Sequence, residues 1–157
     1  MTYEDKPVSK MSKYVTFTLG EETFALSVMQ IKEVLRVSEI APVPGAPSYV
    51  LGIINLRGNV VTIIDARRRF GLTPREVDAA SRILIIENAD QVVGIVVDSV
   101  TEVVELTAEQ IEPAPNVGNE ETAKYIVGVA SPGDELLIIV DLNKLLTPEE
   151  WQEVIEF

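Results

Sequence analysis

Residues 49–65 read YVLGIINLRGNVVTIID, and a matching pattern returns at residues 125–141 as YIVGVASPGDELLIIVD. The two stretches share Tyr, Gly and Asp at matching positions, always 76 residues apart. Apolar matches alone would be unremarkable in a chain with 37 Val and Ile residues, but three matched Tyr, Gly and Asp positions in one order are not. The pattern therefore indicates an internal repeat, which is typical of a fold built from two similar units.

The similarity extends upstream of both stretches. Ile31-Lys-Glu-Val-Leu35 matches Val100-Thr-Glu-Val-Val104, and a Pro-containing segment follows each of them. The 157 residues thus divide into two copies of one unit, which are preceded by a polar segment that we expect to be flexible and followed by an expected C-terminal helix. In chain order these parts are residues 1–12, 13–74, 82–148 and 149–157.

Each copy predicts five strands. Val and Ile far outnumber the 13 Leu residues, and β-branched side chains favour strands over helices. The expected strands are 14–19, 23–28, 31–37, 51–56 and 59–64 in the first copy, and 82–87, 91–97, 100–106, 126–130 and 135–140 in the second. Five short strands hide most of their edges by curling, so we expect an all-β fold of two five-stranded barrels packed side by side. Short helices are expected after Asp65 and Asp141, and a longer one after the Thr147-Pro148 pair.

Composition excludes several classes of function. The chain has no His and no Cys, which rules out disulfides, His- or Cys-based metal sites and His-dependent triads, and we expect no cofactor. With 13 basic and 25 acidic residues the net charge is −12, which disfavours nucleic acid as a partner. The apolar runs are too short to insert into a membrane, and the N-terminus lacks a signal peptide, so a cytoplasmic protein is expected.

Carboxylates are the side chains that an enzyme without His or Cys would use. Asp65 and Asp141 occupy matching positions in the two copies, which fits either a paired-acid catalytic site or two helix caps. A repeat produces matched caps without any catalytic site, so the caps are the preferred interpretation. Asp98 lies between two expected strands and is expected to serve a turn.

The basic residues are concentrated in one region. Six of the 13 cations fall between Arg57 and Arg82, including the triplet Arg67-Arg68-Arg69. This region could meet the complementary charge of a partner, or it could be a solvated face of a short helix.

A Leu-Arg pair stands at the turn in Asn55-Leu-Arg-Gly58, where turn chemistry accounts for the Gly and the Asn but not for the Leu or the Arg. Leu56 and Arg57 therefore suggest an interface, because apolar anchors and Arg carry binding energy. Strand alternation places Glu33 on the same face as Ile31 and Leu35, so its carboxylate would need a partner if that face is covered. Arg57 is the candidate partner.

Several motifs together give the chain a family resemblance. Asn55-Leu-Arg-Gly58 is followed by Val61-Thr-Ile-Ile-Asp65, Val93-Gly-Ile-Val-Val-Asp-Ser-Val100 and Leu137-Ile-Ile-Val-Asp141. In this order and spacing they resemble the CheW family of chemotaxis coupling proteins. The resemblance implies two SH3-like barrels that share a hydrophobic interface, and an adaptor without catalytic activity. Proteins of this family link the cytoplasmic hairpin tip of chemoreceptors to the regulatory domain of a CheA-type histidine kinase within receptor arrays.

The resemblance also implies two sets of contact residues. The receptor hairpin would dock in a groove between the barrels on Ile31, Glu33, Val34, Leu56, Arg57, Val100 and Val103. Kinase contacts would lie at the barrel ends, on Val60 and Ile83. The second copy has Ser131-Pro-Gly-Asp134 where the first has the Leu-Arg turn, so the predicted receptor site occurs once per chain.

Two alternatives to a flagellar chemotaxis coupler stay open at this point. The same adaptor module could serve another receptor–kinase pathway, such as one that governs pili or development. A small enzyme with an Asp-based site is the other alternative, and it would lose turnover in Asp65→Asn or Asp141→Asn variants that still fold.

Overall fold

All ten predicted strands form, each within two residues of its predicted bounds. A computed structural model describes residues 11–88, 91–113, 124–144 and 146–156, so most of the segment that is expected to be flexible lies outside the described residues. The strands are β1 (Ser12–Leu19), β2 (Glu22–Ser27), β3 (Ile31–Arg36), β4 (Val50–Leu56), β5 (Asn59–Asp65), β6 (Arg82–Asn88), β7 (Gln91–Val97), β8 (Ser99–Leu106), β9 (Ile126–Ala130) and β10 (Leu137–Val140).

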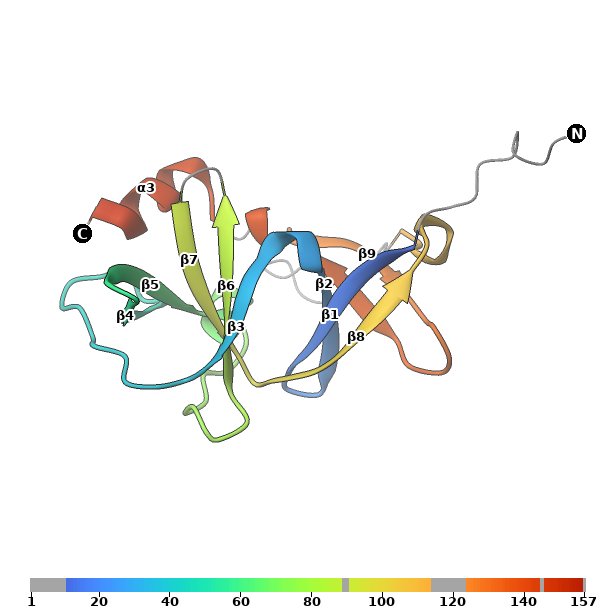
Figure 1. The fold of residues 1–157 in the computed structure, drawn as a ribbon, viewed down its shortest axis with the longest axis horizontal. Coiled ribbons are helices and arrows are strands. Elements are labelled where there is room, and N and C mark those ends of the chain that lie inside the picture. Colours follow the sequence, from blue (N-terminus) through green and yellow to red (C-terminus); the bar gives the residue numbers. More distant parts are fainter. Residues whose placement is uncertain (1–10, 89–90, 114–123, 145, 157) are drawn as a thin grey trace, which may run out of the picture.

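The strands build two five-stranded sheets that lie side by side (Figure 1). Sheet A has the order β8-β1-β2-β10-β9, and sheet B has the order β3-β6-β7-β5-β4. Each sheet therefore combines the first hairpin of one repeat copy with the last three strands of the other copy. The repeat is confirmed by this matching order, but a repeat copy and a sheet are not the same part of the chain.

The predicted all-β fold of two five-stranded units is confirmed, but the sheets are not closed barrels, because the outer strands of each sheet do not pair with each other. The outer edge of β4 is taken instead by Ala41, which exchanges hydrogen bonds of 2.9 and 2.8 Å with Ile53. Glu112 does the same at β9, with two bonds of 2.8 Å to Val129. We call the segments around Ala41 and Glu112 the capping segments. Both contain Pro residues, which interrupt strand pairing, so the chain covers each edge without closing the sheet.

These two edge bridges explain the matched glycines of the repeat. A Cβ atom at Gly52 would collide with the carbonyl group of Ala41, and one at Gly128 would lie 2.5 Å from the carbonyl oxygen of Glu112. Only a residue without a side chain lets the capping segment approach so closely.

The largest hydrophobic core lies between the two sheets. It includes Phe17 and Phe24 of sheet A together with Phe70, which follows β5, and all three are at most 2% exposed. Ring centroids run 5.6 Å from Phe17 to Phe24, 5.5 Å from Phe24 to Phe70 and 5.2 Å from Phe70 to Tyr125. We call the whole hydrophobic core between the two sheets the shared core. A second cluster, which includes Ile63 and Ile83, packs on the opposite face of sheet B.

The helices are short, as expected. Asp65 caps α1 (Ala66–Arg69), and a 3-10 turn, η4 (Leu142–Lys144), follows Asp141. The C-terminal helix α3 (Pro148–Glu156) begins with a capping box, in which Thr147 and Glu150 each bind the other's backbone N–H, at 2.9 and 3.1 Å. α3 buries Trp151 and Val154 in the shared core. No helix in the described part of the chain has the length and apolar character to cross a membrane.

Candidate partner-binding site

A tight turn presents the Leu-Arg pair. Arg57 and Gly58 form the two-residue connection between β4 and β5, with φ values of 51° and 88°, and Asn55 Oδ1 accepts a hydrogen bond of 2.9 Å from the N–H of Gly58. Two positive φ angles are the mark of a type I′ hairpin, in which Asn and Gly are the favoured residues. Arg is costly for the backbone at such a position, so its presence indicates that the side chain has a use.

The predicted partnership of Glu33 and Arg57 is confirmed. β3 alternates between half-buried and exposed residues, which places Glu33 on the half-buried face. The Arg57 guanidinium donates two hydrogen bonds to the Glu33 carboxylate. Nη1 lies 3.4 Å from Oε1, and Nη2 makes a closer contact with Oε2. The hydrogen bond from Arg57 lowers the pKa of Glu33, and the same bond raises the pKa of Arg57. The pair therefore stays charged while 67% of the Arg57 side chain remains exposed.

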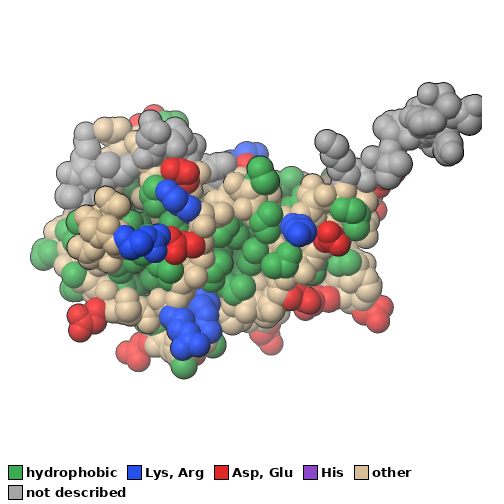
Figure 2. Space-filling view, in the orientation of Figure 1, with side chains coloured by type: hydrophobic (Ala, Val, Ile, Leu, Met, Phe, Trp, Pro, Cys, Tyr) green, Lys and Arg blue, Asp and Glu red, His purple; other side chains and the backbone are tan. Residues whose placement is uncertain are grey.

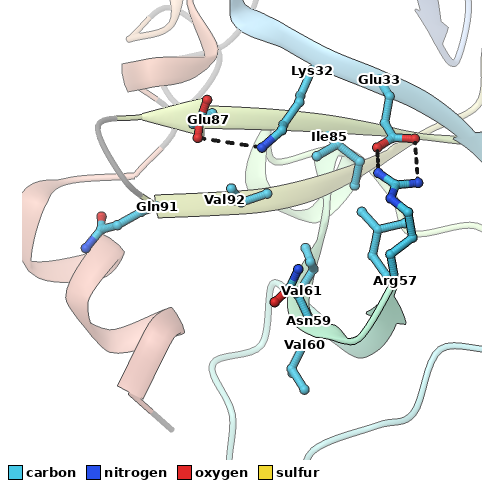
Figure 3. A pocket seen from close by; sticks show the side chains of 11 residues that line it. Lys32, Glu33, Arg57, Asn59, Val60, Val61, Ile85, Glu87, Gln91 and Val92 are labelled. Atoms are coloured by element: carbon cyan, nitrogen blue, oxygen red, sulfur yellow. Dashed lines mark hydrogen bonds and ion pairs between the residues drawn. The ribbon is translucent and has the colours of Figure 1, made fainter.

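This ion pair forms one wall of an open pocket of about 460 Å³ in sheet B (Figure 3). Lys32 and Glu87, 3.7 Å apart, stand at another side, and aliphatic side chains form the floor. The pocket offers apolar surface between two fixed ion pairs, a combination that suits an apolar side chain of a partner. Its lining residues are Lys32, Glu33, Leu56, Arg57, Asn59, Val60, Val61, Ile85, Glu87, Gln91 and Val92.

The structure brings only part of the predicted receptor set into this pocket, namely Glu33, Leu56 and Arg57. Ile31 of β3 and Val100 of β8 lie instead at the border of the shared core, half-buried against it. Val34 and Val103 are 40% and 57% exposed on these same two strands. In Figure 2, hydrophobic side chains continue across the middle of this face, from the half that contains β3 to the half that contains β1 and β8.

The two predicted kinase contacts have different environments. Val60 is 68% exposed and lines the pocket beside Leu56 and Arg57. Ile83 is completely buried in the second cluster of sheet B, so it offers no surface to a partner. β6 is covered on both faces, because Leu84 and Ile86 belong to the shared core. The uninterrupted apolar run at 83–86 was the sequence signal for this double burial.

The basic residues between Arg57 and Arg82 are not a free cationic patch. Arg67 pairs with Asp98 at 2.5 Å, Arg68 with Asp65 at 3.3 Å and Arg69 with Glu150 at 2.5 Å. Arg82 donates hydrogen bonds to the carbonyl groups of Ala79 and Ser81. Each of the six cations has an acceptor within the chain, and Arg57 is the only one of them that lines the pocket in sheet B, so the region as a whole is not a cationic surface for a partner.

The matched carboxylates have structural roles. Asp65 accepts a hydrogen bond of 3.0 Å from the N–H of Arg67, which confirms the predicted cap. Asp141 accepts one of 2.6 Å from the side chain of Gln30. Asp65 ends a strand of sheet B and Asp141 follows a strand of sheet A, so the repeat places them on different sheets.

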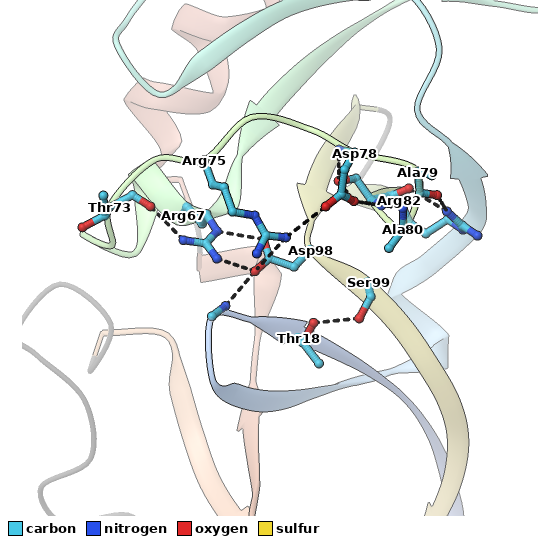
Figure 4. A network of polar contacts seen from close by, with 12 residues as sticks. Thr18, Arg67, Thr73, Arg75, Asp78, Ala79, Ala80, Arg82, Asp98 and Ser99 are labelled. Atoms are coloured by element: carbon cyan, nitrogen blue, oxygen red, sulfur yellow. Dashed lines mark hydrogen bonds and ion pairs between the residues drawn. The ribbon is translucent and has the colours of Figure 1, made fainter.

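Sequence reasoning missed the polar network around Asp98 (Figure 4). Arg67 donates two hydrogen bonds to the Asp98 carboxylate, 2.8 Å from Nε and 2.5 Å from Nη2, and the N–H of Gly20 donates a third at 2.7 Å. Burial disfavours the charged form of Asp98, but the bonds from Arg67 and Gly20 outweigh it and lower the pKa of its carboxyl below the usual 3.8. No local spacing relates three residues so far apart in the chain.

This lowered pKa predicts a loss of stability in acid. Because native Asp98 keeps its charge to a lower pH than unfolded Asp98, its stabilisation is complete above about pH 4 and is lost as the pH falls through the native pKa. Urea unfolding between about pH 6 and pH 2.5 should show a steeper loss of unfolding free energy for the natural chain than for Asp98→Asn. Burial raises the pKa of Asp65, so Asp65 works in the opposite direction and cannot produce this loss. An equal dependence of unfolding free energy on pH in the two proteins would contradict the lowered pKa of Asp98.

The chain is similar to known proteins over most of its length. A family model described as CheW-like domain matches residues 13–150. A protein named Chemotaxis protein CheW from Klebsiella aerogenes is 36% identical over 138 residues, which cover 88% of this chain and 83% of that protein. Its namesake from Bacillus subtilis is 34% identical over 155 residues, which cover 99% and 97%. The crystal structure of the scaffolding protein TtCheW from Thermoanaerobacter tengcongensis superposes with a TM-score of 0.80 at 36% identity, over 87% of this chain and 93% of that one.

Proposed function

This chain belongs to the CheW-like domain family of non-enzymatic chemotaxis adaptors, and we propose that it couples chemoreceptors to a CheA-type histidine kinase. The proposal places the protein in the cytoplasm, where membrane-bound receptor arrays recruit it. The observation that carries the receptor half of the proposal is the Glu33–Arg57 pair at the rim of an open pocket. A strained, exposed Arg held by a carboxylate is a fixed hydrogen-bonding group on an apolar surface.

The receptor partner is proposed to be the helical hairpin at the receptor's cytoplasmic tip. An amphipathic helix binds by laying its apolar stripe into an apolar groove, and charged groups at the groove then set its register. The half-buried Ile31 and Val100 with the exposed Val34 and Val103 supply such a surface on β3 and β8, and Arg57 with Glu33 supplies the charges.

The kinase partner is proposed to contact sheet B around Val60. This side chain is a large exposed apolar group in the lining of the pocket, so the two partners would approach neighbouring surfaces. Single contacts of this size give modest affinity, and many linked contacts in an array add strength by raising the effective concentration.

Binding to purified partners tests this function. We expect the chain to sediment with vesicles that display a receptor cytoplasmic hairpin, and to bind a kinase regulatory domain in calorimetry. Val60→Glu should weaken the second interaction more than the first, although Val60 also lines the pocket beside Arg57. A chain that binds neither partner would overturn the proposal, and failure to restore swimming in a flagellar chemotaxis null strain, with both interactions intact, would point to another receptor pathway.

A further inference from the structure

Asp98 stands at a place where the chain passes from one sheet to the other. β7 ends at Val97 in sheet B and β8 begins at Ser99 in sheet A, so Asp98 is the single residue between them. Its backbone N–H donates a hydrogen bond of 3.0 Å to the carbonyl of Thr18 on β1. The hydroxyl groups of Thr18 and Ser99 lie 2.7 Å apart, which fastens the first residue of β8 to the same strand (Figure 4).

The carboxylate of Asp98 binds elements of both sheets. Gly20, whose N–H donates to it, belongs to the β1–β2 turn of sheet A. Arg67 belongs to α1, which continues from β5 of sheet B, and Arg75 approaches the same carboxylate from the loop after α1, at 3.6 Å. Arg67 also donates to the carbonyl of Thr73 at 2.9 Å, so its guanidinium is held on two sides.

The contact is well sheltered from solvent. The side chains of Arg67 and Asp98 are only 13% and 11% exposed, and Arg67 presents a parallel pair of N–H groups to the carboxylate. A sheltered two-bond Arg–carboxylate pair fixes geometry as well as supplying energy. The pair therefore restrains how sheet A sits relative to sheet B.

This restraint acts on the two walls of the proposed receptor groove. Val100 and Val103 are on β8, which starts immediately after Asp98, whereas Ile31, Glu33 and Val34 are on β3 of the other sheet. We propose that Asp98, held by Arg67, is a positioning residue that sets the spacing between β8 and β3 and so keeps the groove in its binding shape. The identity of the ligand, a receptor hairpin, rests on the proposed function, but the spacing does not.

Spin labels can measure this spacing directly. The chain has no Cys, so Arg36→Cys on β3 and Glu105→Cys on β8, both exposed and outside the proposed site, would carry the only labels. We expect a narrow distance distribution in the otherwise natural chain, and a broader or shifted one in Asp98→Asn with an unchanged circular dichroism spectrum. The same variant should bind the receptor hairpin at least about fivefold more weakly, because fewer molecules hold the binding shape.

Two further variants make the test decisive. Asp134→Asn removes an exposed carboxylate from the β9–β10 turn and should leave both the distances and the affinity unchanged. Arg67→Lys keeps the charge but cannot donate two parallel bonds, so it should repeat the effect of Asp98→Asn, and it replaces that variant if Asp98→Asn does not fold. An unchanged distance distribution in a folded variant, or a broadened one with full affinity, would overturn the positioning role. If the natural chain itself fails to bind the hairpin, the proposed function fails, while the distances still decide whether Asp98 holds the sheets.

Discussion

Arg57→Glu should reduce binding of the receptor hairpin about 100-fold while leaving the fold intact. The substituted carboxylate would face Glu33 at the rim of the pocket, which replaces an ion pair with repulsion and removes the donor offered to the partner. Because 67% of the Arg57 side chain is exposed, its loss should change the stability little. Co-sedimentation with receptor-bearing vesicles measures the affinity, and thermal unfolding followed by circular dichroism reports the fold.

Lys144→Glu is the matched control for this reversal. It makes the same change in net charge at an exposed residue that does not line the pocket, so binding should stay within about twofold of the natural chain. If Arg57→Glu bound the hairpin as tightly as this control does, the pocket would not be part of the receptor site.

The first repeat copy, expressed alone as residues 11–80, should not fold. Four of the eight strand pairs join one copy to the other, namely β1 with β8, β2 with β10, β3 with β6 and β5 with β7. The isolated copy would keep only the hairpins β1–β2 and β4–β5, and a two-stranded hairpin is at best marginally stable in water. It would also lack most of the shared core. Circular dichroism and amide proton dispersion should both report an unfolded chain.

Adding the second copy, residues 81–157, should restore structure in an equimolar mixture, because the missing strands and core residues return together. A first copy that folds cooperatively by itself would contradict the interleaved topology. A useful comparison is the intact chain cleaved within the loop at 72–80, which retains every strand pair and should remain folded.

The strands could be predicted because their signals are local. Alternation, β-branched residues and turn residues each act within a few positions, and all ten strands lie where these signals place them. The same alternation put Glu33 on a half-buried face and so identified its need for Arg57. Strand pairing is a property of segments far apart in the chain, so the repeat suggested two separate barrels when each sheet in fact takes strands from both copies.

The structure places Ile83 and Asp98 differently from what the sequence predicts, and the physical reason is the same for both. The family resemblance implied a kinase contact at Ile83, but a strand with neighbours on both edges and packing on both faces leaves this side chain no solvent contact. Asp98 was expected to serve a turn, and the hydrogen bond from Gly20 of sheet A fits that role. Its ion-pair partner Arg67, however, lies on α1, which follows a strand of sheet B. Such contacts depend on how the sheets pack, which no window of sequence contains.

The exchange of hairpins between the two repeat copies has a consequence for assembly. Two identical half-length chains that swapped these hairpins would form a symmetric dimer, and its stability would depend on protein concentration. In this chain the connection at 66–81 joins the two halves covalently, so each half meets the other at a fixed and high effective concentration. The joined arrangement completes both sheets within one chain, and its two halves can differ in sequence, as they do at the Leu-Arg turn.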